Sequence, residues 1–322
     1  MKKFLKKILF GITLPQEYLC VNHLDFEHTL KVFIKAEKSD QGRDITQRHL
    51  FIGYKPLIIS IDKKYLRDRE LNQNKNLFLS FRIDDNIEIA SLEIKLILEV
   101  KLNSTTCLLF EGVKGVHSFA NHFNKICKSL HYKLTADKKK NIFLEGNLFE
   151  QVKIAYSIPR LIYLASVGSN ELFNIFPTDL SGKFGEDNFI MSLRTKGKAN
   201  SQVESSGKCL IAKMDVNSFM EVYNAGRNHM KELSDATTLG IGLRKEVSTK
   251  FNLPIPLGAI EYYELEKIDK FEVGIHTIHF FRILNSVMLG DNKSILAHIH
   301  RDYAEWRLQN SITTNYFFRK IN

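Results

Sequence analysis

Arg160-Leu-Ile-Tyr-Leu-Ala-Ser-Val167 is the stretch that best indicates the fold of this chain. It is a short apolar run with β-branched and aromatic members, which is typical of a strand. It follows Pro159 directly, so the strand should start at this point. Toward the C-terminus, further runs of strand character follow at 171–176, 188–193, 209–214, 257–266 and 273–283. Short apolar runs separated by polar turns indicate a region built mainly of β-strands.

Two polar segments separate these predicted strands. Pro177-Thr-Asp-Leu-Ser-Gly182 has little bulk and several hydrogen-bonding groups, and we expect a loop there. Arg194-Thr-Lys-Gly-Lys-Ala-Asn-Ser201 is a polar turn that leads into a short helix at 201–206, which Gly207 should end. Backbone N–H groups and hydroxyls at the start of a helix suit a phosphate, because the unsatisfied donors and the helix dipole both favour an anion.

The first 150 residues predict an α+β domain. Apolar residues alternate from Leu92 to Leu102, which indicates a long half-buried strand. The run 50–61 predicts a strand on each side of a kink at Gly53 to Pro56. Helical spacing from Ser118 to Leu130 predicts a helix with Ser118 as its N-cap, and 134–137 and 141–144 look like a strand pair. A length of 322 residues favours two domains, which we place at 1–150 and 151–322.

Composition narrows the class of protein. Hydrophobic residues make up 44% and charged residues 25%, as in an ordinary globular chain. The four cysteines form no Cys-x-x-Cys pair, and no apolar run approaches the ~18 residues of a spanning helix, so we expect a cytoplasmic protein without a membrane partner. The net charge of +10 is dispersed and accompanied by no nucleic-acid-binding motif. Nucleic-acid binding is therefore not indicated, and a small ligand that bears phosphate would use the positive charge equally well.

The order of these elements resembles the flavin-reductase-like family of FMN-binding split barrels, over roughly residues 150–310. Ser206-Gly-Lys-Cys-Leu-Ile-Ala212 is similar to a glycine-led strand of that family, and Gly274-Ile-His-Thr-Ile278 to its Gly-(Asp/Glu)-His-Thr-Ile strand. Ile275 replaces the acidic residue, and Phe281 stands where the family often has glycine.

This resemblance implies an antiparallel split β-barrel preceded by the α+β domain. It further implies FMN as cofactor, with FAD as the alternative, NAD(P)H as co-substrate, a homodimer, and reduction of flavin with electron transfer to an acceptor. His276 would be the catalytic residue, at the side that faces the nicotinamide or the dimer partner. The implied cofactor-binding residues are Asn174, Pro177, Thr178, Asp179, Leu180, Ser181, Ser192, Arg194, Thr195, Lys196, Lys198, Asn200, Ser201 and Thr277.

Other interpretations stay open from the sequence. The turn 194–201 could be an ordinary solvated turn, and Pro177-Thr178 an ordinary β-turn. The barrel could be a degenerate flavin fold kept for dimerisation or partner binding, which the changes at Ile275 and Phe281 favour. A third alternative is an oxygenase or oxidase whose organic substrate is held by the N-terminal domain. His298-x-His300 could be half of a metal site, but no acidic cluster accompanies it, and we predict no metal.

Overall fold

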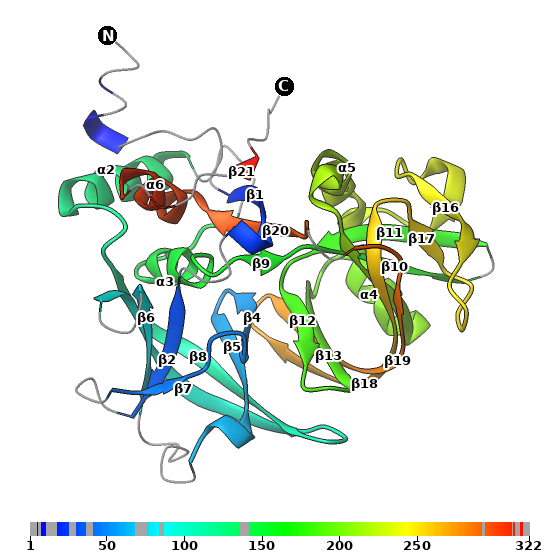
Figure 1. The fold of residues 1–322 in the computed structure, drawn as a ribbon, viewed down its shortest axis with the longest axis horizontal. Coiled ribbons are helices and arrows are strands. Elements are labelled where there is room, and N and C mark those ends of the chain that lie inside the picture. Colours follow the sequence, from blue (N-terminus) through cyan, green and yellow to red (C-terminus); the bar gives the residue numbers. More distant parts are fainter. Residues whose placement is uncertain are drawn as a thin grey trace.

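A computed structural model describes most of the chain. The described residues are 5, 8–10, 18–25, 30–36, 41–67, 76–83, 87–135, 142–169, 171–291, 294–310, 312 and 316–317. Figure 1 shows two large sheets side by side, with short strands running between them. All strand pairs in the two large sheets are antiparallel.

The first large sheet has seven strands and is formed by the N-terminal part of the chain. Its order is β3-β2-β6-β7-β8-β5-β4. The long strand predicted from alternation is confirmed as β7. Strands also flank the predicted kink, but β4 continues through Gly53 and Tyr54, so only Lys55 and Pro56 lie between β4 and β5. The bounds are β2 Lys31–Lys35, β3 Arg43–Asp44, β4 His49–Tyr54, β5 Leu57–Asp62, β6 Leu77–Ile83, β7 Ile87–Lys101 and β8 Thr106–His117.

The second large sheet has eight strands, in the order β12-β13-β19-β18-β14-β10-β11-β15. Among the described residues this order has two ends, so the hydrogen-bonded sheet is not a closed barrel. The bounds are β10 Tyr163–Ser169, β11 Leu172–Thr178, β12 Ser181–Phe184, β13 Asn188–Arg194, β14 Lys208–Met214, β15 Ser234–Asp235, β18 Ala259–Val273 and β19 His276–Met288.

The eight-stranded sheet curls around a core of its own. Phe176 of β11 and Phe189 of β13 belong to one buried cluster, although four strands lie between β11 and β13 in the sheet. The helix α4 (Lys198–Ser206) adds Ala199 and Val203 to the same cluster. Burial of these apolar side chains is the main force that holds α4 against the sheet.

Smaller elements complete the fold. A four-stranded sheet, β21-β1-β20-β9, lies between the large ones, and β16 pairs with β17 alone. The strands are β1 Tyr18–Asn22, β9 Arg160–Leu161, β16 Leu243–Val247, β17 Pro254–Pro256, β20 Leu296–His300 and β21 Tyr316–Phe317. The helices are α2 His122–Thr135, α3 Leu148–Ala155, α5 Phe219–Asn224 and α6 Arg301–Gln309, with 3-10 turns η1 His23–Asp25, η2 Lys63–Tyr65, η5 Val216–Ser218, η6 Ala225–Met230 and η7 Ala236–Thr238.

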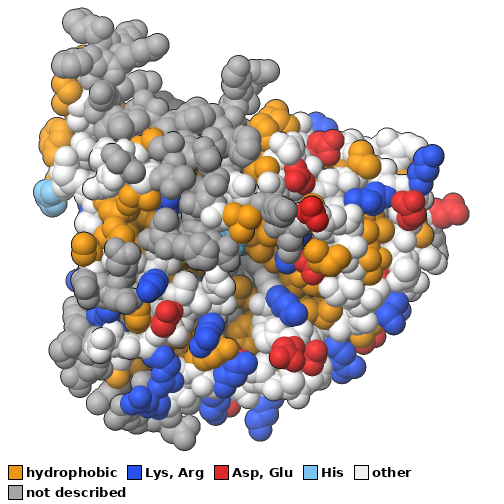
Figure 2. Space-filling view, in the orientation of Figure 1, with side chains coloured by type: hydrophobic (Ala, Val, Ile, Leu, Met, Phe, Trp, Pro, Cys, Tyr) orange, Lys and Arg blue, Asp and Glu red, His pale blue; other side chains and the backbone are white. Residues whose placement is uncertain are grey.

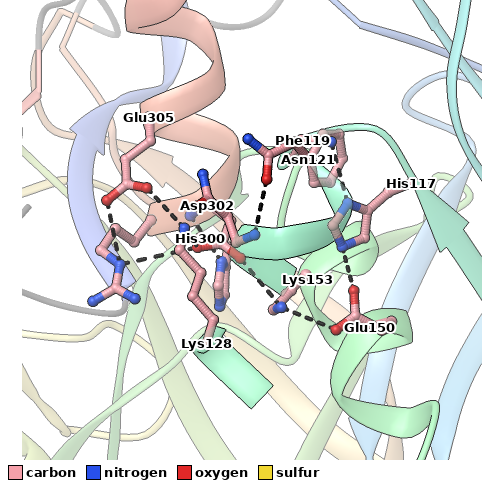
Figure 3. A network of polar contacts seen from close by, with 11 residues as sticks. His117, Phe119, Asn121, Lys128, Glu150, Lys153, His300, Asp302 and Glu305 are labelled. Carbon is pink, nitrogen blue, oxygen red and sulfur yellow. Dashed lines mark hydrogen bonds and ion pairs between the residues drawn. The ribbon is translucent and has the colours of Figure 1, made fainter. Parts of the chain in front are cut away.

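A buried ionic network joins the C-terminal helix α6 to helices from the N-terminal part. Lys128 of α2 lies 2.7 Å from Asp302 and 2.8 Å from Glu305 of α6, while Lys153 of α3 lies 3.2 Å from Asp302 and 3.0 Å from Glu150 (Figure 3). Burial would raise the pKa of Asp302, but Lys153, His300 and Lys128 hold it well below its usual value. The boundary at residue 150 stays a prediction, and α3 spans it.

The expected loop at 177–182 is wrong, because most of it is strand. Pro177 and Thr178 end β11, Ser181 begins β12, and only Asp179 and Leu180 lie between the strands. Strand β11 lies between β10 and β15, but β15 pairs with it only at Leu172 and Phe173. At Pro177 the β15 side of β11 therefore has no partner strand, and a proline is tolerated there. The helix that follows the 194–201 turn starts three residues earlier than expected, and Gly207 ends it in a left-handed conformation with φ 62°.

Two expectations for 118–144 are also wrong. The N–H and the hydroxyl of Ser118 both donate to the carbonyl of Ile89, so Ser118 extends the strand pairing and does not cap a helix. Helix α2 starts at His122, where Asn121 accepts from the N–H of Asn124 at 2.8 Å. Residues 134 and 135 are the end of α2, and 142–144 form no strand; residues 136–141 lie outside the described part.

The surface agrees with a dispersed charge. Figure 2 shows Lys and Arg side chains spread over one face, with acidic side chains between them. No helix in the described part of the chain is long and apolar enough to cross a membrane.

Candidate functional site

The predicted phosphate-binding turn is an open helix start. Gly197 is the N-cap of α4 and has no side chain to bond the first N–H groups of the helix. The side chains of Arg194, Lys196 and Lys198 are exposed around it, and Lys198 forms an exposed ion pair with Glu232 at 2.5 Å. Uncapped N–H groups with exposed cations around them are a suitable environment for a phosphate. Ser201 instead donates to the carbonyl of Lys198, at 2.9 Å.

Side chains behind the turn fix its shape. Thr277 of β19 donates to the hydroxyl of Thr195 at 3.1 Å. Asn200 donates to the carbonyl of Thr195 at 3.3 Å and its side-chain oxygen accepts from Nε2 of His279 at 2.7 Å. Thr277, Asn200 and His279 are all buried. They therefore hold the turn from inside, while the three cations face outward.

Tyr54 of the N-terminal sheet lies beside this turn. Nε of Arg194 donates to the Tyr54 hydroxyl at 2.9 Å. Burial raises the pKa of Tyr54, and the nearby Arg194 opposes that rise. Sequence reasoning missed Tyr54, because 140 residues separate it from Arg194 and no local pattern marks it.

His276 packs against the ring of Tyr54. The rings of the two residues meet edge to face, 4.6 Å apart, and His276 is only 1% exposed. The N–H of Tyr54 donates to its Nε2 at 3.3 Å, so the ring proton is on Nδ1, which lies 3.2 Å from the hydroxyl of Ser192. Burial, with Arg194 and Arg160 nearby, lowers the pKa of His276 to about 4. A contact of His276 with a nicotinamide stays a prediction, and it would require Tyr54 to move.

The predicted ring-edge segment is largely engaged with the protein itself. Asp179 forms ion pairs with Arg160 at 3.2 Å and with His298 at 3.0 Å. Burial would raise the pKa of Asp179, but these two partners hold it well below its usual value. Thr178, Leu180 and Ser181 are buried, and the carbonyl of Leu180 accepts from the N–H of Ser192 at 2.9 Å.

The two predicted segments lie on either side of η6. Nε2 of His229 donates to the carbonyl of Pro177 at 2.7 Å, and a Cβ on Gly197 would lie 3.7 Å from the carbonyl of His229. Asn174 donates to the side chain of Gln202 in α4 at 2.7 Å and to the carbonyl of Asn228 at 3.0 Å. The structure thus connects 174–181 with 194–202 through η6.

Sequence reasoning missed Arg160 and His229 as well as Tyr54. Arg160 could have been found from the sequence, because it is a charged residue at the start of an otherwise apolar strand. A charged side chain in such a position is expected to have an ion-pair partner. His229 carried none, because its partner is a backbone carbonyl far away in the sequence.

The comparisons with known proteins give structural neighbours only. No family model matches the chain, and no curated protein matches it. The chain is similar to an FMN-binding protein from Thermus thermophilus with bound p-hydroxybenzaldehyde, with 15% identity and a TM-score of 0.39 over 44% of this chain and 82% of that one.

Two further structures are similar to a comparable extent. The flavin reductase component of a bacterial two-component tryptophan halogenase shows 12% identity and a TM-score of 0.40, over 45% of this chain and 90% of that one. An NADH:FAD oxidoreductase from Streptomyces globisporus shows 10% identity and a TM-score of 0.39, over 46% and 87%.

Proposed function

We propose that this chain is a flavin-binding oxidoreductase of the split-barrel type, with FMN as its flavin. The observation that carries this proposal is the uncapped start of α4 with Arg194, Lys196 and Lys198 exposed around it. A flavin nucleotide needs a phosphate clamp of this kind. The curled sheet, in which Phe176 and Phe189 share one core, supports the split-barrel form.

The residues fit the two ends of FMN unequally. At the phosphate end, the N–H groups are uncapped and the three cations are exposed, and Lys198 would exchange its ion pair with Glu232 for the phosphate. At the ring edge, the side chain of Asp179 already forms ion pairs with Arg160 and His298. The flavin ring would therefore have to bond to backbone groups between β11 and β12. A bound flavin would supply hydride and electron transfer from NAD(P)H to an acceptor, whereas the protein provides position and polarity.

The proposal includes a cytoplasmic homodimer. Free cysteines support the reducing compartment, since Cys20, Cys107 and Cys209 are buried and Cys127 is partly buried, all without disulfides. A family-like dimer would place FMN near the subunit interface, and sedimentation of the purified chain tests it.

A second candidate function is a flavin fold that binds without catalysis. The cover that Tyr54 places over His276 favours it, because the predicted nicotinamide-facing residue is closed off. Steady oxidation of NADH or NADPH with added FMN would exclude this candidate. Flavin binding with no turnover would support it.

The decisive experiment compares FMN with riboflavin, which lacks the phosphate. We expect FMN to bind more tightly, and the double variant Arg194→Ala/Lys196→Ala to weaken FMN by about tenfold or more while leaving riboflavin unchanged. The control Lys245→Ala/Lys250→Ala removes two exposed lysines elsewhere and should have no effect. Equal affinity for the two flavins, or binding of neither, would refute the proposal.

A further inference from the structure

A cavity of about 290 Å³ lies where the two large sheets meet. Its walls come from β4, from β9 and from β12, which Figure 1 shows close to one another at the centre of the molecule. Its volume is at the lower end of the range for small-molecule pockets, about 300 Å³ and above. None of the residues 192–201 lines it, so it is separate from the start of α4.

Three buried polar side chains on the wall have an atom without a hydrogen-bond partner. They are His49, which is 6% exposed, and Arg160 and Ser181, which are each 7% exposed. The unpartnered atoms are Nε2 of His49, Nε of Arg160 and Oγ of Ser181. A buried polar atom without a partner is costly, so three around one cavity point to a ligand that satisfies them.

The hydrogen-bonding role of each atom follows from its surroundings. Nδ1 of His49 lies 2.9 Å from the carbonyl of Ile45 and must donate to it, so Nε2 of the neutral ring is an acceptor. Burial lowers the pKa of His49, which keeps the ring neutral. Nε of Arg160 is a donor, and Ser181 can donate or accept. The ligand must therefore offer an acceptor to Arg160 and a donor to His49.

The charge around the cavity favours an anion. Asp179 on the wall is shared by two cations, Arg160 and His298. Lys183 adds an exposed positive charge to the wall, and Lys213 is neutralised by Glu261 at 2.5 Å. The described side chains thus leave an excess of positive charge. Phe51, Tyr163 and Tyr263 complete the wall and offer aromatic surface.

We propose that this cavity binds a small aromatic carboxylate that bears a hydroxyl group. The carboxylate accepts from Arg160 and Ser181, the hydroxyl donates to Nε2 of His49, and the ring packs among the aromatic side chains. Asp179 and Ser181 on the wall also belong to the predicted ring-edge segment, and for that reason the test is carried out on the full chain without flavin. Success or failure here is therefore separate from the outcome with FMN.

The test is calorimetric titration of the full chain with 4-hydroxybenzoate. Two related probes remove one feature each, because 4-hydroxybenzamide lacks the charge and benzoate lacks the hydroxyl. We expect 4-hydroxybenzoate to bind at least tenfold more tightly than the amide and about three- to tenfold more tightly than benzoate, as expected for one charged and one neutral hydrogen bond. Equal affinity for the acid and the amide, or no binding of the acid at millimolar concentration, would overturn the proposal.

Variants locate the binding in this cavity. Ser181→Ala should weaken 4-hydroxybenzoate about three- to tenfold, and Arg160→Gln more strongly. Ser205→Ala, an exposed serine on α4, is the matched control and should change nothing. If Arg160→Gln fails to fold because Asp179 loses one of its two ion-pair partners, Ser181→Ala still tests the proposal. Unchanged affinity in Ser181→Ala would place any binding elsewhere and contradict the proposal.

Discussion

The backbone N–H of Tyr54 donates a hydrogen bond to Nε2 of His276 at 3.3 Å, across 222 residues of sequence. This bond joins the end of β4 in one large sheet to the start of β19 in the other. It also fixes the proton of His276 on Nδ1, toward Ser192. A histidine with both ring nitrogens engaged and almost no exposure stays neutral at neutral pH.

The first prediction concerns the protonation of His276. Burial and two nearby arginines lower its pKa to about 4, so its ring should remain neutral until the pH falls well below 6.5. Because the folded pKa is below the unfolded one, the stability it contributes is full above about pH 6.5 and declines as the pH falls toward about 4. Imidazole NMR signals during a pH titration measure this, with His276→Asn to assign the signal. A midpoint near 6.5 would contradict the buried position.

The second prediction concerns Gly274, in the turn between β18 and β19. Its φ is +57°, and a Cβ there would lie 2.1 Å from the carbonyl of Lys55. Gly274→Ala should therefore lower the free energy of unfolding by about 1–3 kcal/mol and disturb the contact of β4 with β19. Urea unfolding measures the change. Gly290→Ala is the control, because nothing lies within 4 Å of that position and its φ is not positive, and an equal loss in both variants would disprove the explanation.

Local patterns were enough to predict individual elements. The alternation from Leu92 to Leu102 and the terminating Gly207 follow from side-chain period and backbone sterics, which act within a few residues. The turn 194–201 before a helix was visible for the same reason. The position of Ser118 was misjudged because its bond to Ile89 depends on how β7 and β8 pair, which is a long-range property.

The candidate site could be predicted only in part. The sequence separates Tyr54 from His276, and Asp179 from both Arg160 and His298, so their contacts depend on the arrangement of whole sheets. Asp179 was predicted to face a flavin because the matching loop does so in the family. Its two ion pairs appear only once β9 and β20 are placed beside it.

The third prediction concerns the buried ionic network of Figure 3. Lys153 is 1% exposed and lies close to both Asp302 and Glu150. Lys153→Met keeps the volume but leaves buried carboxylates with less compensation, and we expect a loss of about 3–5 kcal/mol in unfolding free energy. Chemical denaturation measures it, and Lys245→Met on the exposed strand β16 is the control. A loss no larger than that of the control would show that the network contributes little.

The fourth prediction uses the ion pair of His298 with Asp179. Burial would lower the pKa of His298, but Cys20 and the Asp179 carboxylate raise it to about 10. This pKa in the folded protein is above the ordinary value of about 6.5. The ion pair of His298 therefore makes its whole contribution to the unfolding free energy below about pH 6.5, and this contribution is lost as the pH rises toward about 10. For Asp179 the sign is opposite, and its contribution is lost as the pH falls below about 3.9.

The measurement is the difference in unfolding free energy between the wild-type chain and His298→Asn, followed from about pH 6 to about pH 10. We expect this difference to shrink steadily as the pH rises, because the wild-type imidazolium loses its proton while the asparagine has none to lose. His122→Asn, at an exposed position, should show a small difference that does not follow this trend. A difference between wild type and His298→Asn that stays constant across the range would mean that His298 is neutral in the folded protein and only donates a hydrogen bond to Asp179.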